Sequence, residues 1–226
     1  MTAEDRSLLR SVLAIGLACL AIGVSFGAIT VASGLPGWVA IAMSVFVFAG
    51  GAQFMAVGLV AAGNPFAAVF AGLLLNARHV PFGLALGDTL GTRWRDKLVG
   101  SHIMTDESVA FALSRPAGPA RRRAYWATGA TLFVLWNIGA VLGVLLGGAV
   151  GDTDALGLDA AFPAGLIALL LPALRDRDTR GVALTGAALA VVSTPFLPAG
   201  LPVLLALGGL GVLALSRRRD RAGVAS

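Results

Sequence analysis

The sequence predicts an all-α integral membrane protein, a polytopic bundle of about eight hydrophobic segments, some of them short, broken or re-entrant. Apolar residues make up 57% of the 226 residues and charged residues only 13%, whereas charged residues make up about 25% of a soluble globular chain. The mean hydropathy is +0.86. The apolar residues also fall in long runs that match the thickness of a bilayer, which indicates helices surrounded by membrane lipid.

The runs follow one another along the whole chain, and a full span needs about 20 residues. The long or nearly long enough runs are 8–31, 38–62, 65–86, 124–150 and 160–174. The shorter runs, which need packing partners, are 98–113, 181–192 and 201–215. We therefore expect a single transmembrane domain over residues 1–226. The first run exceeds the apolar core of a signal peptide, about 7 to 15 residues, so we expect an uncleaved helix.

Basic residues are distributed unevenly among the connections, and such residues favour the cytoplasmic side. The basic connections contain Arg93, Arg95 and Lys97; Arg115 and Arg121 to Arg123; Arg175, Arg177 and Arg180; and Arg217 to Arg221. The connections without Lys or Arg are 34–37, 151–159 and 193–200. This pattern predicts a multi-pass protein with cytoplasmic N- and C-termini. It also explains the pI of about 10.9 as a topology signal, so we expect no nucleic-acid partner.

Eight full crossings would place the first basic connection, which contains Arg93, on the wrong side of the membrane. If 65–86 and 98–113 are instead re-entrant or broken elements that both return to the cytoplasmic side, every basic connection lies inside. The sequence leaves the number of full crossings open.

Glycine is abundant, with 30 residues in the chain. Gly139, Gly143 and Gly147 are four residues apart and form a smooth stripe on one helix face, which predicts close packing against another helix.

Other glycines and prolines interrupt predicted helices next to polar residues. Gly50 and Gly51 precede Gln53, and Pro81 follows Arg78 by three residues. Unwinding at these places frees backbone N–H and C=O groups, which at membrane depth are tolerated only where protein surrounds them or a wet cavity opens. Half-helix ends of this kind are typical of transporter binding sites.

Charged and polar side chains cluster in two neighbouring segments, at Asn76, Arg78 and His79 and at Asp106 and Glu107. Each charge facing lipid at the centre of a helix costs about 2.5 to 3.5 kcal/mol, so these groups must face one another or a cavity. A structural ion pair between Arg78 and either carboxylate is one interpretation, and a solute-binding site is the other.

More polar residues share the segment 98–113. If the segment is one helix, the first polar strip holds Ser101, Thr105 and Ser108, and the second holds His102 and Asp106. The helix would then be amphipathic, unless His102 is simply solvated near the interface.

A set of motifs in this order resembles the AzlC family, the large permease subunits of bacterial branched-chain amino acid exporters. The motifs are Gly23-Val-Ser-Phe-Gly27, Phe48-Ala-Gly-Gly-Ala-Gln-Phe54, Asn76-Ala-Arg-His79, Thr105-Asp-Glu-Ser108 and Gly157-Leu-Asp-Ala-Ala-Phe-Pro163. The resemblance implies a permease in the cytoplasmic (inner) membrane of a bacterium that exports branched-chain or other hydrophobic amino acids. It also implies a small, separately encoded membrane subunit of the AzlD type.

The sequence has no nucleotide-binding P-loop and no H-E-x-x-H, C-x-x-C or G-x-S-x-G motif. We therefore expect no enzyme activity and no cofactor, and an ion gradient, most simply of protons, as the driving force. The predicted substrate-binding residues are Gly50, Gly51, Gln53, Asn76, Arg78, Thr105, Asp106, Glu107 and Ser108. The predicted proton-coupling residues are Asp106 and Glu107, with His79 as the alternative.

Within this site, Arg78 or the helix end near Gly51 would receive the carboxylate of an amino acid, and Asp106 or Glu107 its ammonium. The apolar wall would come from Phe26, Phe46, Phe48 and Phe54. The alternatives are transport of another small solute or in the opposite direction, a scaffold that only holds a partner subunit, and an intramembrane enzyme using Ser101, Ser108 and His102.

Overall fold

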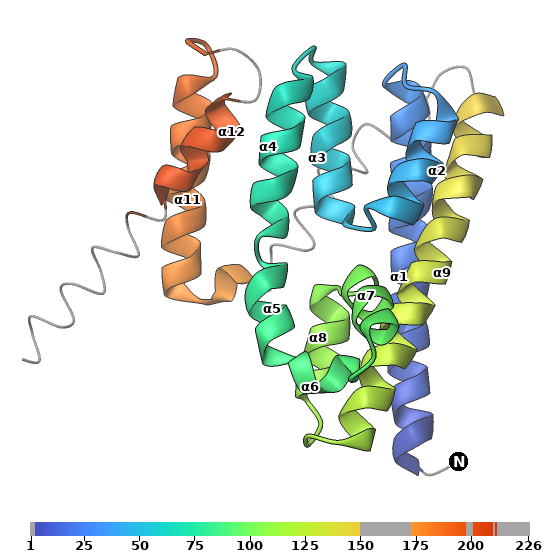
Figure 1. Cartoon of the computed structure of the whole chain (residues 1–226). Helices are drawn as coiled ribbons and strands as arrows, with labels where there is room; N and C mark the ends of the chain where they lie inside the picture. Colours follow the sequence, from blue (N-terminus) through green and yellow to red (C-terminus); the bar gives the residue numbers. More distant parts are fainter. Residues whose placement is uncertain (1–2, 150–172, 198–200, 210, 212–226) are drawn as a thin grey trace, which may run out of the picture.

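The computed structural model describes residues 3–149, 173–197, 201–209 and 211, and all regular structure among these residues is helical. The helices of the first part are α1 (Ala3–Ala32), α2 (Gly37–Phe46), α3 (Gly50–Ala61), α4 (Pro65–Asn76), α5 (His79–Ala85), α6 (Gly87–Leu90), α7 (Trp94–His102), α8 (Asp106–Leu113) and α9 (Pro119–Ala149) (Figure 1). The later ones are η2 (Ala173–Arg175), α11 (Arg177–Ser193), α12 (Leu201–Leu205) and η3 (Ala206–Gly209). Most of the predicted segment 160–174 lies outside the described residues.

The frame of the molecule is a pair of long helices, α1 and α9, that run side by side in the same direction (Figure 1). A Cβ added to Gly23 would lie 2.7 Å from the carbonyl oxygen of Trp136, and one added to Gly147 would lie 3.1 Å from Cα of Ala28. The contacts therefore advance together along both helices, which makes the pair parallel. The predicted close packing of the Gly139, Gly143 and Gly147 stripe is confirmed.

A short hairpin, α2–α3, enters from the C-terminal end of α9 and returns to it. Gly37, at the start of α2, packs against Val144, whereas Gly50, at the start of α3, packs against Trp136 near the middle of α9. The two helices have 10 and 12 residues, which is about 15 to 18 Å at 1.5 Å per residue. This is about half of the 30 Å hydrocarbon core, so the predicted segment 38–62 folds as a re-entrant hairpin.

A second short hairpin, α7–α8, enters from the opposite end. The Tyr125 hydroxyl donates to the carbonyl of Gly100 at 2.7 Å, and a Cβ on Gly129 would lie 2.8 Å from the carbonyl oxygen of Ile103. Thus α7 follows α9 to its middle. The chain then turns at 103–105 and returns along α8, until Arg121 donates to the carbonyl of Arg115 at 3.1 Å.

Between the hairpins, α4 and α5 stack end to end with a break at 77–78 (Figure 1). Residues Pro65–Ala85 are together long and apolar enough to cross a membrane, as are Leu8–Ala32 and Pro119–Gly148. The predicted segment 65–86 is therefore a broken crossing.

This arrangement places the connections before α7 and before α9 at the same end of the frame as the start of α1. The basic residues Arg93, Arg95 and Lys97 then share one end with Arg121 to Arg123, as the arrangement with broken and re-entrant elements requires. The expectation is wrong for the segment 65–86, which runs the length of the frame instead of returning to the side on which it starts. The segment 38–62 is re-entrant in its place, so the basic connections still share one end.

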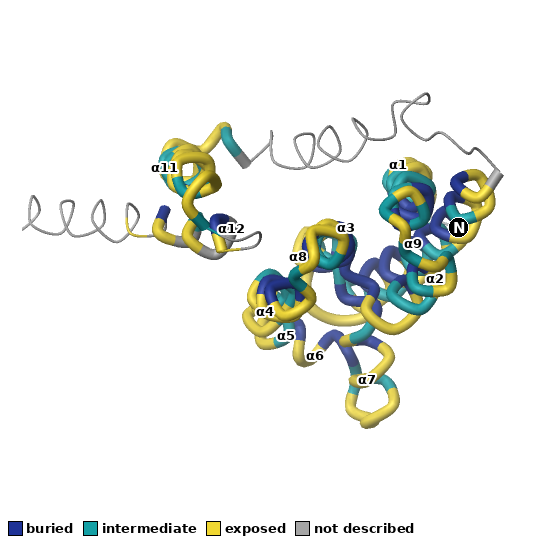
Figure 2. The backbone as a smooth tube through the Cα atoms, turned by 90° about the horizontal axis from the view of Figure 1, so that it is seen from above, coloured by how far each residue is buried: buried dark blue, intermediate teal, exposed yellow. Residues whose placement is uncertain are grey.

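The buried residues of the core lie along the α1–α9 pair and the helices that pack on it. Figure 2 shows buried residues where α1, α2, α3 and α9 face one another. The core there includes Phe26, Phe54, Val57, Leu132 and Trp136. In contrast, α4 exposes Phe66, Phe70 and Leu73, as expected for a surface that faces lipid.

Candidate functional site

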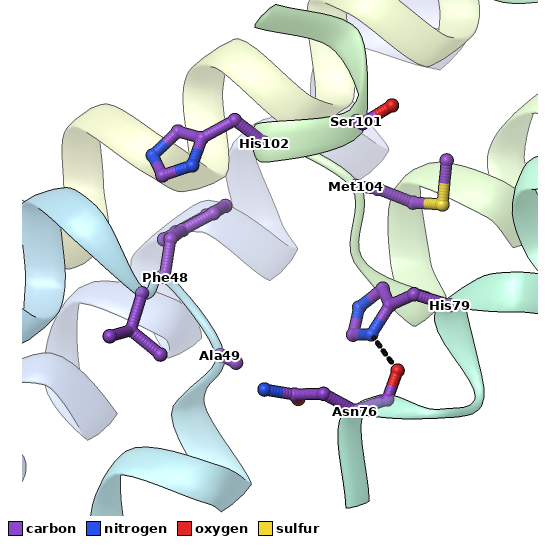
Figure 3. Close-up of a pocket in the computed structure, with 8 residues that line it drawn as sticks. Phe48, Ala49, Asn76, His79, Ser101, His102 and Met104 are labelled. Carbon is purple, nitrogen blue, oxygen red and sulfur yellow. Dashed lines mark hydrogen bonds between the residues drawn. The ribbon is translucent and has the colours of Figure 1, made fainter. Parts of the chain in front are cut away.

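The three helix breaks meet at one pocket of about 180 Å³. Its lining residues are Val47, Phe48 and Ala49 from the α2–α3 turn, Asn76 and His79 from the α4–α5 break, and Ser101, His102 and Met104 from the α7–α8 turn (Figure 3). A water molecule occupies about 30 Å³ of liquid, so the space corresponds to about six waters. This is smaller than the roughly 300 to 1,000 Å³ of pockets for drug-sized ligands, so the space suits only a small solute.

The α2–α3 turn is held by a fully buried glutamine. The Gln53 side chain accepts from the backbone N–H of Ala49 at 3.1 Å and donates to the Ser44 hydroxyl at 3.4 Å. It therefore joins the end of α2 to the start of α3. The predicted site residue Gln53 is not among the residues that line the pocket; it shapes the turn that does.

Two backbone features make this turn specific. A Cβ on Gly50 would lie 3.0 Å from the indole of Trp136, so a glycine lets α3 begin directly against α9. Phe48 has a φ of 44°, the one positive φ at a non-glycine position among the described residues. A bulky residue in this region is strained by about 1 to 3 kcal/mol, and such strain is concentrated at functional sites.

The two pocket histidines are each fixed by a backbone carbonyl. His102 Nε2 lies 2.7 Å from the carbonyl oxygen of Val45, and His79 Nδ1 lies 3.0 Å from that of Asn76. A carbonyl can only accept, so these nitrogens carry the protons, and the other nitrogen of each ring remains an acceptor in neutral imidazole. The carbonyls belong to the last turns of α2 and α4, where helices leave carbonyls unpaired and favour positive charge.

Asn76 offers an unused acceptor. Its Oδ1 is buried and has no hydrogen-bond partner in the described parts of the chain, and Figure 3 shows its amide directed toward Ala49 at the start of α3. A buried carbonyl oxygen without a partner costs about 1 to 3 kcal/mol. A bound donor, such as an ammonium, would remove that cost.

Arg78 and Asp106 form an ion pair with an N–O distance of 2.6 Å. The side chains are 39% and 46% exposed, so the pair is not sealed in the core. It ties the α4–α5 break to the first residue of α8, beside the pocket but not among its lining residues. This is the ion pair that the sequence offered as one of two interpretations of Arg78.

The start of α8 is built from Thr105 and Ser108. Each side chain bonds to the backbone N–H of the other residue, at 3.1 Å and 2.9 Å, which is a capping box. The expectation of one continuous helix with polar strips over 98–113 is therefore wrong, because the chain breaks at 103–105. Thr105 followed by two acidic residues is itself a helix-start signal that would have placed this break.

Glu107 is the carboxylate of this cluster with no ion-pair or hydrogen-bond partner in the described residues. It is partly buried in the first turn of α8. Thus Asp106 and Glu107, neighbours in sequence, have different surroundings.

The structure brings two of the predicted residues, Asn76 and His79, into the pocket. Gly50, Gly51 and Gln53 belong to the first turn of α3, and Thr105 and Ser108 to the start of α8, and none of these five lines the pocket. Sequence reasoning did not assign Ser101, His102 and Met104 to a binding site. Of the four phenylalanines, Phe48 lines the pocket, Phe26 and Phe54 pack on Trp136, and Phe46 is exposed.

No group of three or more His, Cys, Asp or Glu side chains with the spacing of a metal site occurs in the part of the chain that the structure describes.

A family model described as AzlC protein matches residues 14–150, which include all three breaks. The chain belongs to the AzlC family. This is a family of transport proteins rather than enzymes, and together with the long apolar helices it makes the chain a membrane protein.

Two relatives show the extent of the similarity. The chain is 29% identical over 205 residues to the branched-chain amino acid transport protein AzlC of Bacillus subtilis (strain 168), which covers 88% of this chain and 80% of that protein. It is 30% identical over 180 residues to an uncharacterized membrane protein of Helicobacter pylori (strain ATCC 700392 / 26695), which covers 78% of each. No solved structure matches the chain.

Proposed function

We propose that this protein is a permease that exports branched-chain or other hydrophobic amino acids across the cytoplasmic membrane of a bacterium. A proton gradient drives it, its termini are cytoplasmic, residues 1–226 form one membrane domain, and a small AzlD-type subunit assembles with it. The observation that carries the proposal is the meeting of three helix breaks at one small pocket. The B. subtilis relative, whose name refers to branched-chain amino acid transport, supports the substrate class.

The chemistry of the pocket suits an amino acid. Backbone N–H groups at the start of α3 have no side-chain cap, and such groups attract a carboxylate. The unpaired Oδ1 of Asn76 would accept from the ammonium, while Phe48 and Met104 supply an apolar wall for an aliphatic side chain. In this account Arg78 and Asp106 control the site instead of touching the substrate, and Gln53, Thr105 and Ser108 position it.

Two half-length hairpins entering from opposite ends support alternating access. The crossing α1 is followed by a hairpin from one end, and the oppositely directed crossing α4–α5 is followed by a hairpin from the other end (Figure 1). Inverted units of this kind are common in secondary transporters, which open a central site to one side at a time. The Arg78–Asp106 pair would act as the latch, because separating α5 from α8 must break it.

For coupling, the unpaired Glu107 is the first carrier that we propose. Asp106 becomes available for a proton only when the latch opens, and His79 remains the alternative carrier inside the pocket. Each of the three predicted coupling residues thereby has a different role in the cycle.

The test is efflux of labelled leucine from preloaded proteoliposomes containing this chain, with and without the small subunit, under a pH gradient imposed in each direction. We expect efflux that follows the gradient and that Asn76→Leu abolishes, since this variant keeps the size of the side chain but removes its amide. Gly58→Ala is the control, because the space around Gly58 is open. Efflux indifferent to Asn76→Leu would contradict the site, and no movement of any amino acid with the partner present would favour the scaffold alternative.

A further inference from the structure

A second, shallow pocket of about 380 Å³ lies at the N-terminal end of α9. Its lining residues are Asp96, Arg122, Arg123 and Trp126, none of which the transport pocket uses. The arginines belong to the basic run that the sequence explains only as a topology signal.

Arg122 is held in place by two contacts, and these leave some of its N–H donors without a close acceptor among the described residues. Its guanidinium lies over the Trp126 ring at 5.9 Å and has one nitrogen 3.4 Å from the Asp96 carboxylate, which is long for a charge-assisted hydrogen bond. The loop at Gly91, where φ is 106°, lies close to the pair, because an added Cβ would lie 2.6 Å from Arg122 Nη1 and 2.8 Å from Asp96 Oδ2. Arg123 has no ion-pair partner among the described residues.

We infer the depth of this pocket relative to the membrane from two tryptophans, Trp126 in its lining and Trp94 on the same helix as Asp96. Trp126 sits one helical turn, about 6 Å, further along α9 than Arg122, and Trp94 at the start of α7 is 68% exposed with Arg95 over its ring at 5.7 Å. Tryptophan gathers at the level where hydrocarbon meets headgroups. Arg122 and Arg123 therefore lie one turn outward, at the level of the headgroup phosphates.

We propose that this pocket binds the phosphate group of an anionic phospholipid. Two guanidiniums offer several N–H donors to phosphate oxygens, and basic pockets between membrane helices on the cytoplasmic side are suited to such headgroups. Asp96 orients Arg122 but also competes with the phosphate for it. The bound lipid would join α7 to α9 and so hold the base of the α7–α8 hairpin against the frame.

Lipid retention by the purified full-length protein, measured by native mass spectrometry, tests this proposal. Wild-type protein is titrated with phosphatidylglycerol and, separately, with phosphatidylcholine. The double variant Arg122→Gln, Arg123→Gln should lose about 30-fold in affinity for phosphatidylglycerol, from about 5-fold per basic residue near an anionic surface. Arg6→Gln is the matched control, an exposed arginine at the same end of the frame, and should change affinity less than twofold.

The variant Asp96→Asn is predicted to change phosphatidylglycerol affinity in the opposite direction, as a gain of binding instead of a loss. It removes the competitor and should tighten phosphatidylglycerol binding, whereas a loss of binding would contradict the competition. Equal retention of both lipids by wild type, or equal behaviour of the double variant and Arg6→Gln, would overturn the proposal. A thermal shift produced by inorganic phosphate alone, without a further shift on adding lipid, would overturn the lipid as the source of the phosphate.

Discussion

The α1–α9 pair and the three broken segments differ in how their helices pack: the pair is continuous, whereas the broken segments end near polar groups. In the pair, glycines remove side chains so that two uninterrupted helices touch along their backbones. In α2–α3, α4–α5 and α7–α8 the helices stop near the middle of the frame, and polar groups collect where they stop.

The difference shows how a small membrane protein can combine closely packed continuous helices with polar backbone groups at membrane depth. The continuous pair needs no polar groups in its contact. The broken segments can leave carbonyls and N–H groups at membrane depth because the pair and each other's ends surround them. His102 on the carbonyl of Val45, from one hairpin to the other, is the clearest case.

The largest expected effect comes from filling the contact of the continuous pair. A Cβ on Gly143 would meet the backbone of Val24, and backbone cannot move aside as a side chain does, so we expect Gly143→Leu to cost more than about 3 kcal/mol. The measurement is the yield and melting temperature of protein in detergent. Gly148→Leu, on the same helix with open space around it, should melt like wild type, and equal loss in both variants would refute a specific glycine contact.

The next effect tests the latch between two broken segments. Arg78→Gln and Asp106→Asn should each reduce leucine efflux at least about 10-fold, because the ion pair that closes the site is lost. The exchanged pair, Arg78→Asp with Asp106→Arg, should recover part of the rate. Single variants that transport normally would show that the pair is only structural.

A smaller effect is expected from the buried glutamine of the α2–α3 turn. Gln53→Met leaves the Ala49 N–H and the Ser44 hydroxyl without their partner, at about 1 to 3 kcal/mol. Combining it with Ser44→Ala should cost less than the sum of the two single changes, measured as thermal stability, because both remove the same hydrogen bond. Strict additivity would mean that Gln53 does not bridge the turn.

The smallest effect on stability, and a specific one on coupling, is expected for Glu107→Gln. No described partner is lost, so melting should change by less than about 0.5 kcal/mol. If Glu107 carries the proton, efflux should persist down a leucine gradient but no longer respond to an imposed pH gradient. Unchanged pH dependence would move the coupling to Asp106 or His79.

The sequence alone predicted the helical membrane class, the glycine stripe and two residues that line the pocket, Asn76 and His79, because these depend on the cost of each residue in its local surroundings. A charge such as Arg78 or Asp106 is expensive in lipid wherever its neighbours lie, and a stripe at Gly139, Gly143 and Gly147 needs only the helical period. The basic connection at Arg93 also indicated correctly that some segments do not cross fully.

The residues that line the pocket could not be predicted in the same way. Ser101 and His102 meet Phe48 only because two hairpins from opposite ends turn at the same height on α9, which no local pattern encodes. The sequence left open whether Arg78 faces a solute or pairs with a carboxylate, and in the structure it pairs with Asp106. The choice depends on the backbone turn at 77–78, which decides which of Asn76, Arg78 and His79 faces inward.

The central claim, a solute pocket formed by three helix breaks, is tested most directly by cysteine accessibility. Cys19 is the single cysteine of the chain, so Cys19→Ala provides a background in which Ser101→Cys, in the pocket, and Leu73→Cys, on the exposed face of α4, are compared. We expect a water-soluble thiol reagent to label the cysteine at position 101, leucine to protect it, and the cysteine at position 73 to react slowly and without regard to leucine. No labelling at position 101, or labelling that leucine leaves unchanged, would contradict the account.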